Sequence, residues 1–191
     1  MIHVVTGGSG SGKSEYAERL IAENAAGALS YVATMMIWDR EGEARVRRHR
    51  SMRADRGFIT VEQYTELKSL NLSEVCTEEA LAGCPGFLSA KNTICHRDAS
   101  VLLECMSNLV SNEFYRDEEK ALSHILEGID ALRSGCRELV IVTNEVFSDG
   151  TEYSEETMRY IALLGRVNRL LGRMADTVTE VVYGIPVRIK G

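Results

Sequence analysis

A glycine-rich phosphate-binding motif near the start of the chain constrains its fold more than any other feature. The motif has the pattern G-x-x-x-x-G-K-[ST] and consists of Gly7, Gly8, Ser9, Gly10, Ser11, Gly12, Lys13 and Ser14. A short apolar run at 2–6 precedes it, and a helical pattern at 14–22 follows it. Because this strand–loop–helix order is the context in which such motifs hold phosphate, the sequence predicts a nucleoside triphosphate site.

Each part of the motif has a chemical role in that site. Glycines let backbone N–H groups curl around phosphate oxygens. Lys13 is predicted to place its charge on the β and γ phosphates of ATP or GTP, and the Ser14 hydroxyl is the expected Mg²⁺ ligand. The alternative, a glycine-rich turn with an incidental lysine, does not explain the flanking strand and helix.

Length, charge and cysteine content limit the class of protein. The chain has 191 residues, 45% of them hydrophobic, which predicts one domain over 1–191. A net charge of −6 argues against non-specific nucleic-acid binding. The sequence shows no apolar run that could span a membrane and no resemblance to a signal peptide. Five cysteines without a C-x-x-C pair are typical of reduced thiols, so we expect a cytoplasmic protein without a catalytic cysteine.

Short apolar strands alternate with helical stretches along most of the chain. The pattern predicts strands at 2–6, 29–34, 101–104, 139–143, 177–183 and 186–190, and helices at 14–22, 39–53, 117–133 and 155–174. Fully apolar strands between helices favour an α/β fold with a mainly parallel sheet covered on both faces. The last two strands, on either side of Gly184, are expected to pair at the sheet edge. Residues 64–99 show no sustained periodicity and are expected to form an insertion packed on the domain.

A histidine surrounded by arginines is the second informative feature. If residues 45–53 are helical, Arg45, His49 and Arg53 share one face. Neighbouring cations should lower the pKa of His49, and a neutral imidazole can act as a nucleophile on phosphorus. The alternative is a solvated basic helix face with an incidental histidine, and the residues alone favour that alternative.

Several ordered motifs resemble one enzyme family over nearly the whole chain except 64–99. They are TGGSGSGKS, YVAT, ARVRRHR, TVE, LLEC, VTNEV, GRVN and GIPVRIKG. Together they are similar to the bifunctional adenosylcobinamide kinase and adenosylcobinamide-phosphate guanylyltransferase family of cobalamin assembly. That resemblance implies phosphorylation of adenosylcobinamide, followed by transfer of GMP from GTP to the new phosphate through a GMP–histidine intermediate on His49.

The resemblance also implies ligand contacts and an assembly state. The implied GTP contacts outside the phosphate-binding motif are Ala33, Thr34, Met35, Arg50, Ser51, Met52, Arg53, Glu62 and Glu104. A homotrimer is implied, with nucleotide sites near the subunit boundaries. Glu104 ends an apolar strand, where an acid that organises Mg²⁺ is expected; the alternative is a carboxylate that caps the next helix.

Some positions depart from the family pattern, and two rival functions remain open. Gly10, Phe147 and Arg169 stand where the family often has arginine, glycine and glutamine, so the acceptor surface is expected to differ. Asn144 and Glu145 follow a buried strand and are candidates for shaping the cobinamide pocket. The rivals are a monofunctional small-molecule kinase and a nucleotide-dependent switch. The absence of the guanine-reading N-K-x-D pattern disfavours the switch.

Overall fold

The computed structural model describes residues 1–25, 27–36, 57–72, 99–147, 150 and 153–191. The described part holds a seven-stranded sheet in the order β3-β2-β4-β5-β1-β6-β7. The strands are β1 (Ile2–Thr6), β2 (Leu29–Ala33), β3 (Phe58–Glu62), β4 (Ser100–Glu104), β5 (Glu138–Val142), β6 (Thr177–Val182) and β7 (Ile185–Lys190). All neighbouring strands pair in parallel except β6 and β7, which pair antiparallel. The predicted α/β fold with a C-terminal edge pair is confirmed.

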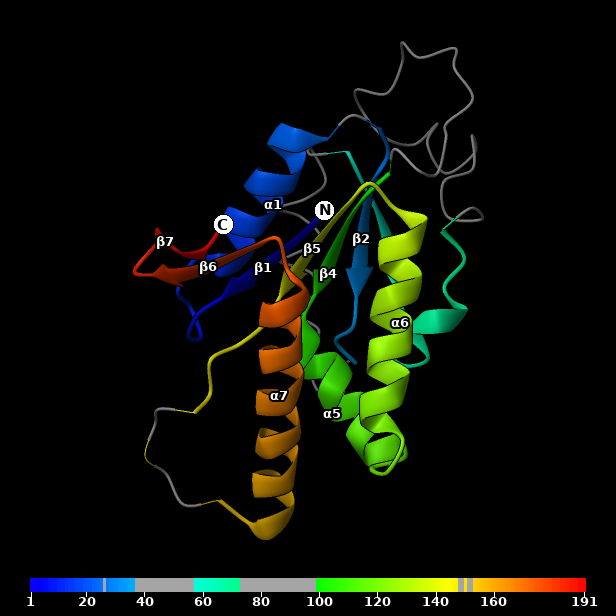
Figure 1. Cartoon of the computed structure of the whole chain (residues 1–191), viewed down its shortest axis with the longest axis vertical. Helices are drawn as coiled ribbons and strands as arrows, with labels where there is room; N and C mark the ends of the chain where they lie inside the picture. Colours follow the sequence, from blue (N-terminus) through cyan, green and yellow to red (C-terminus); the bar gives the residue numbers. More distant parts are fainter. Residues whose placement is uncertain (26, 37–56, 73–98, 148–149, 151–152) are drawn as a thin grey trace.

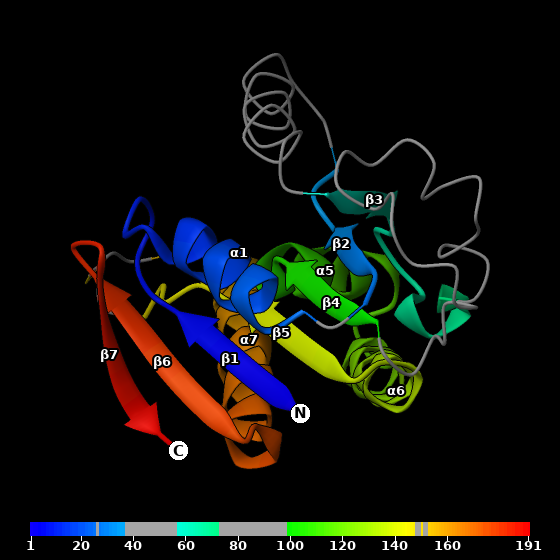
Figure 2. The same ribbon diagram turned by 90° about the horizontal axis from the view of Figure 1, so that it is seen from above.

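Helices cover both faces of this sheet (Figures 1 and 2). The described helices are α1 (Lys13–Asn24), α5 (Met106–Arg116), α6 (Ala121–Gly135) and α7 (Glu155–Met174), with a short 3₁₀ turn, η1 (Leu67–Ser69). Alternation along the strands divides the core in two: Val5 and Leu102 pack with α1, whereas Val4 and Leu103 pack with the other three helices. Burial on both faces explains why the central strands are continuous apolar runs.

Three elements, β3, α5 and the short η1, were not predicted, and one helix begins later than expected. β3 is only half-buried and lacks an apolar run, and α5 follows β4 so closely that its start was not recognised. The helix expected at 117–133 begins at Ala121, because the Asp117 carboxylate accepts the Lys120 N–H and holds a turn there. The helix expected at 39–53 lies outside the described residues, as does most of the insertion expected at 64–99. Within the described part of the chain, no helix is both long and apolar enough to cross a membrane.

Replacing either of two helical glycines by alanine should change the free energy of unfolding in opposite directions. A Cβ on Gly128 of α6 would lie 2.6 Å from the Leu67 Cβ of η1, whereas a Cβ on Gly172 of α7 would meet nothing within 4 Å. We expect Gly128→Ala to lower the free energy of unfolding by about 1–3 kcal/mol through overpacking. Gly172→Ala should raise it by about 0.5–1 kcal/mol, because alanine costs less backbone entropy in a helix. Urea unfolding of both variants checks this, and a shift of the same sign in both would contradict the packing of α6 against η1.

Candidate functional site

The loop between β1 and α1 requires glycine at both of its ends, because a side chain there would clash or be strained. A Cβ on Gly7 would lie 2.6 Å from the Val181 carbonyl oxygen and 2.7 Å from Ser11 Oγ. Gly12, which directly precedes α1, has a φ of +90°, in the left-handed region that favours glycine. The loop therefore delivers its backbone N–H groups to the N-terminus of α1, an arrangement that binds anions.

Lys13 is held inside this loop. Its side chain is buried and its Nζ donates a hydrogen bond to the Gly8 carbonyl, 2.9 Å away. Burial lowers the pKa of Lys13, and the nearby Cys105 and Glu104 side chains act in the opposite direction. An anion in the loop would add to that opposing effect and favour the charged ammonium.

A carboxylate from β4 meets the hydroxyl at the start of α1. Ser14 Oγ donates a hydrogen bond to Glu104 Oε1. Within the described residues, Glu104 Oε2 and Ser11 Oγ are buried polar atoms without a hydrogen-bond partner. Buried polar groups are nearly always paired, so these two atoms are available to contact a ligand of the loop. The Ser14 and Glu104 oxygens are the hard donors that Mg²⁺ prefers, so they fit a magnesium ion.

Strands β2 and β3 bring two more predicted contact residues to the same edge. Ala33 lies opposite Glu104 in one pairing and opposite Glu62 in the other. The Thr34 N–H donates to the Glu104 carbonyl (3.0 Å), and its hydroxyl donates to the Cys105 carbonyl (2.7 Å). The carboxyl ends of β2, β3 and β4 are thus fixed relative to one another, as expected for a ligand site in a parallel sheet.

A polar network continues this edge beyond β4 and β5. Asn144 Nδ2 donates a hydrogen bond to Ser107 Oγ (2.5 Å). Ser107 Oγ is also hydrogen-bonded to Cys105 Sγ, 3.0 Å away. Burial raises the pKa of the Cys105 thiol, so this thiol is a poor nucleophile at neutral pH. The Glu145 N–H donates to the Gly7 carbonyl (3.1 Å), which joins the end of β5 to the phosphate loop.

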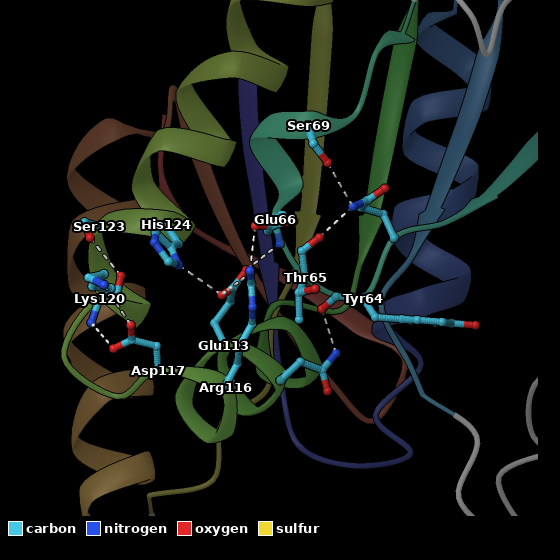
Figure 3. Close-up of polar contacts among 12 residues, drawn as sticks. Tyr64, Thr65, Glu66, Ser69, Glu113, Arg116, Asp117, Lys120, Ser123 and His124 are labelled. Atoms are coloured by element: carbon cyan, nitrogen blue, oxygen red, sulfur yellow. Dashed lines mark hydrogen bonds and ion pairs between the residues drawn. The ribbon is translucent and has the colours of Figure 1, made fainter.

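Sequence reasoning missed the residues on α5 that hold the segment following β3. Asn112 Nδ2 donates to the carbonyls of Thr34 (2.9 Å) and Tyr64 (2.8 Å) and so ties β2 to the chain beyond β3. At the next residue of α5, the buried Glu113 carboxylate accepts the Glu66 N–H (2.6 Å), and Figure 3 shows His124 and Arg116 beside it. No local sequence signal reveals these contacts, because they join α5, which was not predicted, to residues about 50 to 80 positions away.

Some predicted site residues lie outside the described part of the chain, and others lie away from the Ser14–Glu104 contact. His49, Arg50, Ser51, Met52 and Arg53 are outside the described residues. Met35 is described and is half-buried just beyond Thr34. Three residues depart from the family pattern. The ring of Phe147, the first of them, packs next to α7: a Cβ on Gly165 would lie 3.4 Å from its Cε1. Gly10 has a φ of +71°, and Arg169 lies on α7.

The sequence matches a known family over nearly its full length. The family model described as "Cobinamide kinase / cobinamide phosphate guanyltransferase" matches residues 3–92 and 87–189. Two relatives, from Escherichia coli (strain K12) and Salmonella typhimurium (strain LT2), are both named "Bifunctional adenosylcobalamin biosynthesis protein CobU". They are 31% and 30% identical to this chain, and in each case 100% of both chains is covered. A solved structure of the KaiC-like protein PH0186 from Pyrococcus horikoshii OT3 covers 94% of this chain and 71% of its own, at 14% identity and a TM-score of 0.46.

Proposed function

This chain belongs to the cobinamide kinase / cobinamide phosphate guanyltransferase family, and on that basis we propose that it carries out both reactions in cobalamin biosynthesis. It phosphorylates adenosylcobinamide with ATP or GTP. It then transfers GMP from GTP to adenosylcobinamide phosphate and gives adenosylcobinamide-GDP. The proposal includes a single domain over 1–191 with an insertion near 64–99, and a homotrimer that sedimentation can test.

The observation that carries the proposal is the meeting of three groups at the phosphate loop. Lys13 is buried in the loop, and the Ser14 hydroxyl contacts Glu104 from β4. This set of an ammonium, a hydroxyl and a carboxylate is the one that phosphoryl-transfer enzymes of this loop type use. The unpaired oxygen of Glu104 supports the view that the set is completed by a ligand.

In the kinase step, these residues bind and orient the triphosphate. Loop N–H groups and Lys13 hold the β and γ phosphates. Ser14 and Glu104 would hold Mg²⁺, which when bound would neutralise charge on the phosphates. The acceptor hydroxyl attacks the γ-phosphorus, the bond to the β-phosphate oxygen breaks, and the hydroxyl proton leaves to solvent or a base. Asn144, which follows β5 and donates a hydrogen bond to Ser107, is proposed to contact the acceptor.

In the transferase step, His49 is the proposed nucleophile. Its imidazole attacks the α-phosphorus of GTP and pyrophosphate leaves; the phosphate of the acceptor then displaces GMP from the histidine. Residues Arg50 to Arg53 are proposed to hold the triphosphate, and Ala33, Thr34, Met35 and Glu62 to contact the rest of the GTP. In support, the chain leaves β2 at Thr34, which is hydrogen-bonded to the Glu104 backbone, before it enters the segment that carries His49.

Product analysis tests the function directly. The purified chain is incubated with cobinamide, MgCl₂ and ATP or GTP, and the corrinoid products are identified by mass spectrometry. We expect cobinamide phosphate with either nucleotide and cobinamide-GDP with GTP. Formation of the phosphate alone would support a monofunctional kinase, and hydrolysis of nucleotide without cobinamide would support a switch.

Replacing Glu104 should impair the proposed metal site without disturbing the fold. Glutamine has the same shape, so Glu104→Gln can still accept the Ser14 hydrogen bond but loses the negative charge that binds Mg²⁺. We expect the kinase rate at saturating nucleotide to fall about 10²-fold, and the Mg²⁺ concentration for half-maximal activity to rise. Glu127→Gln is the matched control, because Glu127 is exposed and pairs with the exposed Lys68 on η1. An unchanged Mg²⁺ dependence in Glu104→Gln would contradict the metal role.

A further inference from the structure

We propose that Tyr183, in the turn between β6 and β7, is the platform on which the base of the kinase-step nucleotide stacks. This inference rests on the proposed kinase activity and adds the position of the base.

The β6–β7 turn is packed directly against the phosphate loop. The Gly184 N–H donates a hydrogen bond to the Ser11 carbonyl, 2.8 Å away. A Cβ on Gly12 would lie 3.3 Å from the Gly184 Cα, so the two backbones touch without side chains between them. Both ribbon views show the turn beside the loop that connects β1 to α1 (Figures 1 and 2). The turn is therefore part of the wall of the nucleotide site.

Tyr183 occupies this turn at a backbone angle that disfavours a large side chain. Its φ is +51°, and Gly184 follows with a φ of +78°. A bulky residue in the left-handed region is strained, and such strain is often found where a residue serves a ligand. The Tyr183 side chain is 94% exposed, the most exposed of the large hydrophobic side chains described. The turn thus presents an aromatic ring that contributes little to the core.

The positions of Ser14 and Glu104 set the direction of the triphosphate. Glu104 ends β4, which lies on the β5 side of β1, whereas β6 and β7 lie on the other side of β1. Serine and carboxylate groups of this kind would hold a metal at the β- and γ-phosphate end of the nucleotide. The γ-phosphate therefore points toward β4, and the ribose and base extend in the opposite direction, toward the β6–β7 turn.

In GMP transfer, the second proposed reaction, the guanine base of GTP lies at a different position. The proposed GTP contacts for GMP transfer, Thr34 and Glu62, lie at the ends of β2 and β3, on the far side of Glu104 from Tyr183. The phosphate loop thus lies between two base positions, one on each side. A base on Tyr183 would present the γ-phosphate for the kinase step, and a base near Glu62 would serve GMP transfer. Because stacking is tolerant of base identity, the Tyr183 side should accept both ATP and GTP.

Steady-state kinetics of Tyr183→Ala, Tyr183→Phe and Tyr115→Ala test the inference. We expect Tyr183→Ala to raise KM for ATP in the kinase reaction about tenfold with kcat retained, because base stacking is lost. Tyr183→Phe, which keeps the ring, should restore the wild-type KM. Tyr115 is 62% exposed on α5, so Tyr115→Ala should leave the kinetics unchanged. In GMP transfer to pre-formed cobinamide phosphate, KM for GTP should not change in Tyr183→Ala.

Two binding measurements separate failure of this inference from failure of the proposed function. Calorimetry with inorganic tripolyphosphate should give the same affinity for wild type and Tyr183→Ala, whereas ATP should bind the variant about tenfold more weakly. An unchanged ATP affinity overturns the inference even if the chain is a kinase. An equal loss of tripolyphosphate and ATP affinity also overturns it, because it shows that the turn only supports the loop. If wild type forms no cobinamide phosphate, the proposed function fails, and the calorimetry still decides whether Tyr183 binds the base.

Discussion

Lys13→Met should lower the rate of cobinamide phosphorylation about 10³-fold, the order expected when one preorganised charge is removed from the transferring phosphoryl group. The buried Lys13 ammonium lies inside the loop, 2.9 Å from the Gly8 carbonyl, where no other described side chain supplies a positive charge to the loop. Methionine has a similar length and is uncharged, so it fills the same space. The Gly8 carbonyl also accepts the Ser11 N–H, so it keeps a partner in the variant.

The matched control for Lys13 is the same substitution at an exposed lysine. Lys68 on η1 pairs with Glu127 at 3.0 Å, and both side chains are mostly exposed, so Lys68→Met should change neither activity nor folding appreciably. Rates are measured at saturating ATP and cobinamide, with thermal unfolding as a check on the fold. Wild-type kinase activity in Lys13→Met would contradict the assignment of the loop as the kinase phosphate site.

His49→Ala should separate the two activities. We expect GMP transfer to fall by at least about 10³-fold, because the displacement loses its nucleophile. Phosphorylation of cobinamide does not use the imidazole, so its rate should stay within about threefold of wild type. This split distinguishes a catalytic histidine from one that only supports the fold, since misfolding would lower both rates together.

His124→Ala is the control for removal of an imidazole. His124 lies on α6, where Nδ1 is 3.3 Å from the buried Glu113 carboxylate, away from the phosphate loop. We expect this variant to keep the ratio of the two activities even if its stability is lower. Equal loss of both activities in His49→Ala, or retention of GMP transfer, would show that the nucleophile is another group.

The central part of the fold could be predicted from sequence because its signals are local. Each buried strand is a short apolar run, and the phosphate loop is a contiguous motif between a strand and a helix. Glu104 was implied by the family resemblance and supported by its place at the end of such a run, and the structure joins it to Ser14. In these cases the residue types, the spacing and the burial all indicate the same structure.

The rest of the site depends on contacts between residues far apart in sequence. β3 is half-buried and takes its place from parallel pairing with β2, which leaves no periodic pattern to recognise. Asn112 joins Thr34 to Tyr64 from a helix that was not predicted. The contact of Gly184 with Ser11 joins the last turn of the sheet to the first loop, and only the folded topology reveals it.

Covalent labelling with GTP is the most direct measurement of the central claim, which is that the chain carries GMP on His49. Wild type and His49→Ala are incubated with GTP labelled at the α or the γ position, denatured and counted. We predict a label from α-labelled GTP alone, stable to base, lost in acid and absent from His49→Ala. No label on wild type, or an equal label on the variant, would contradict transfer through this histidine.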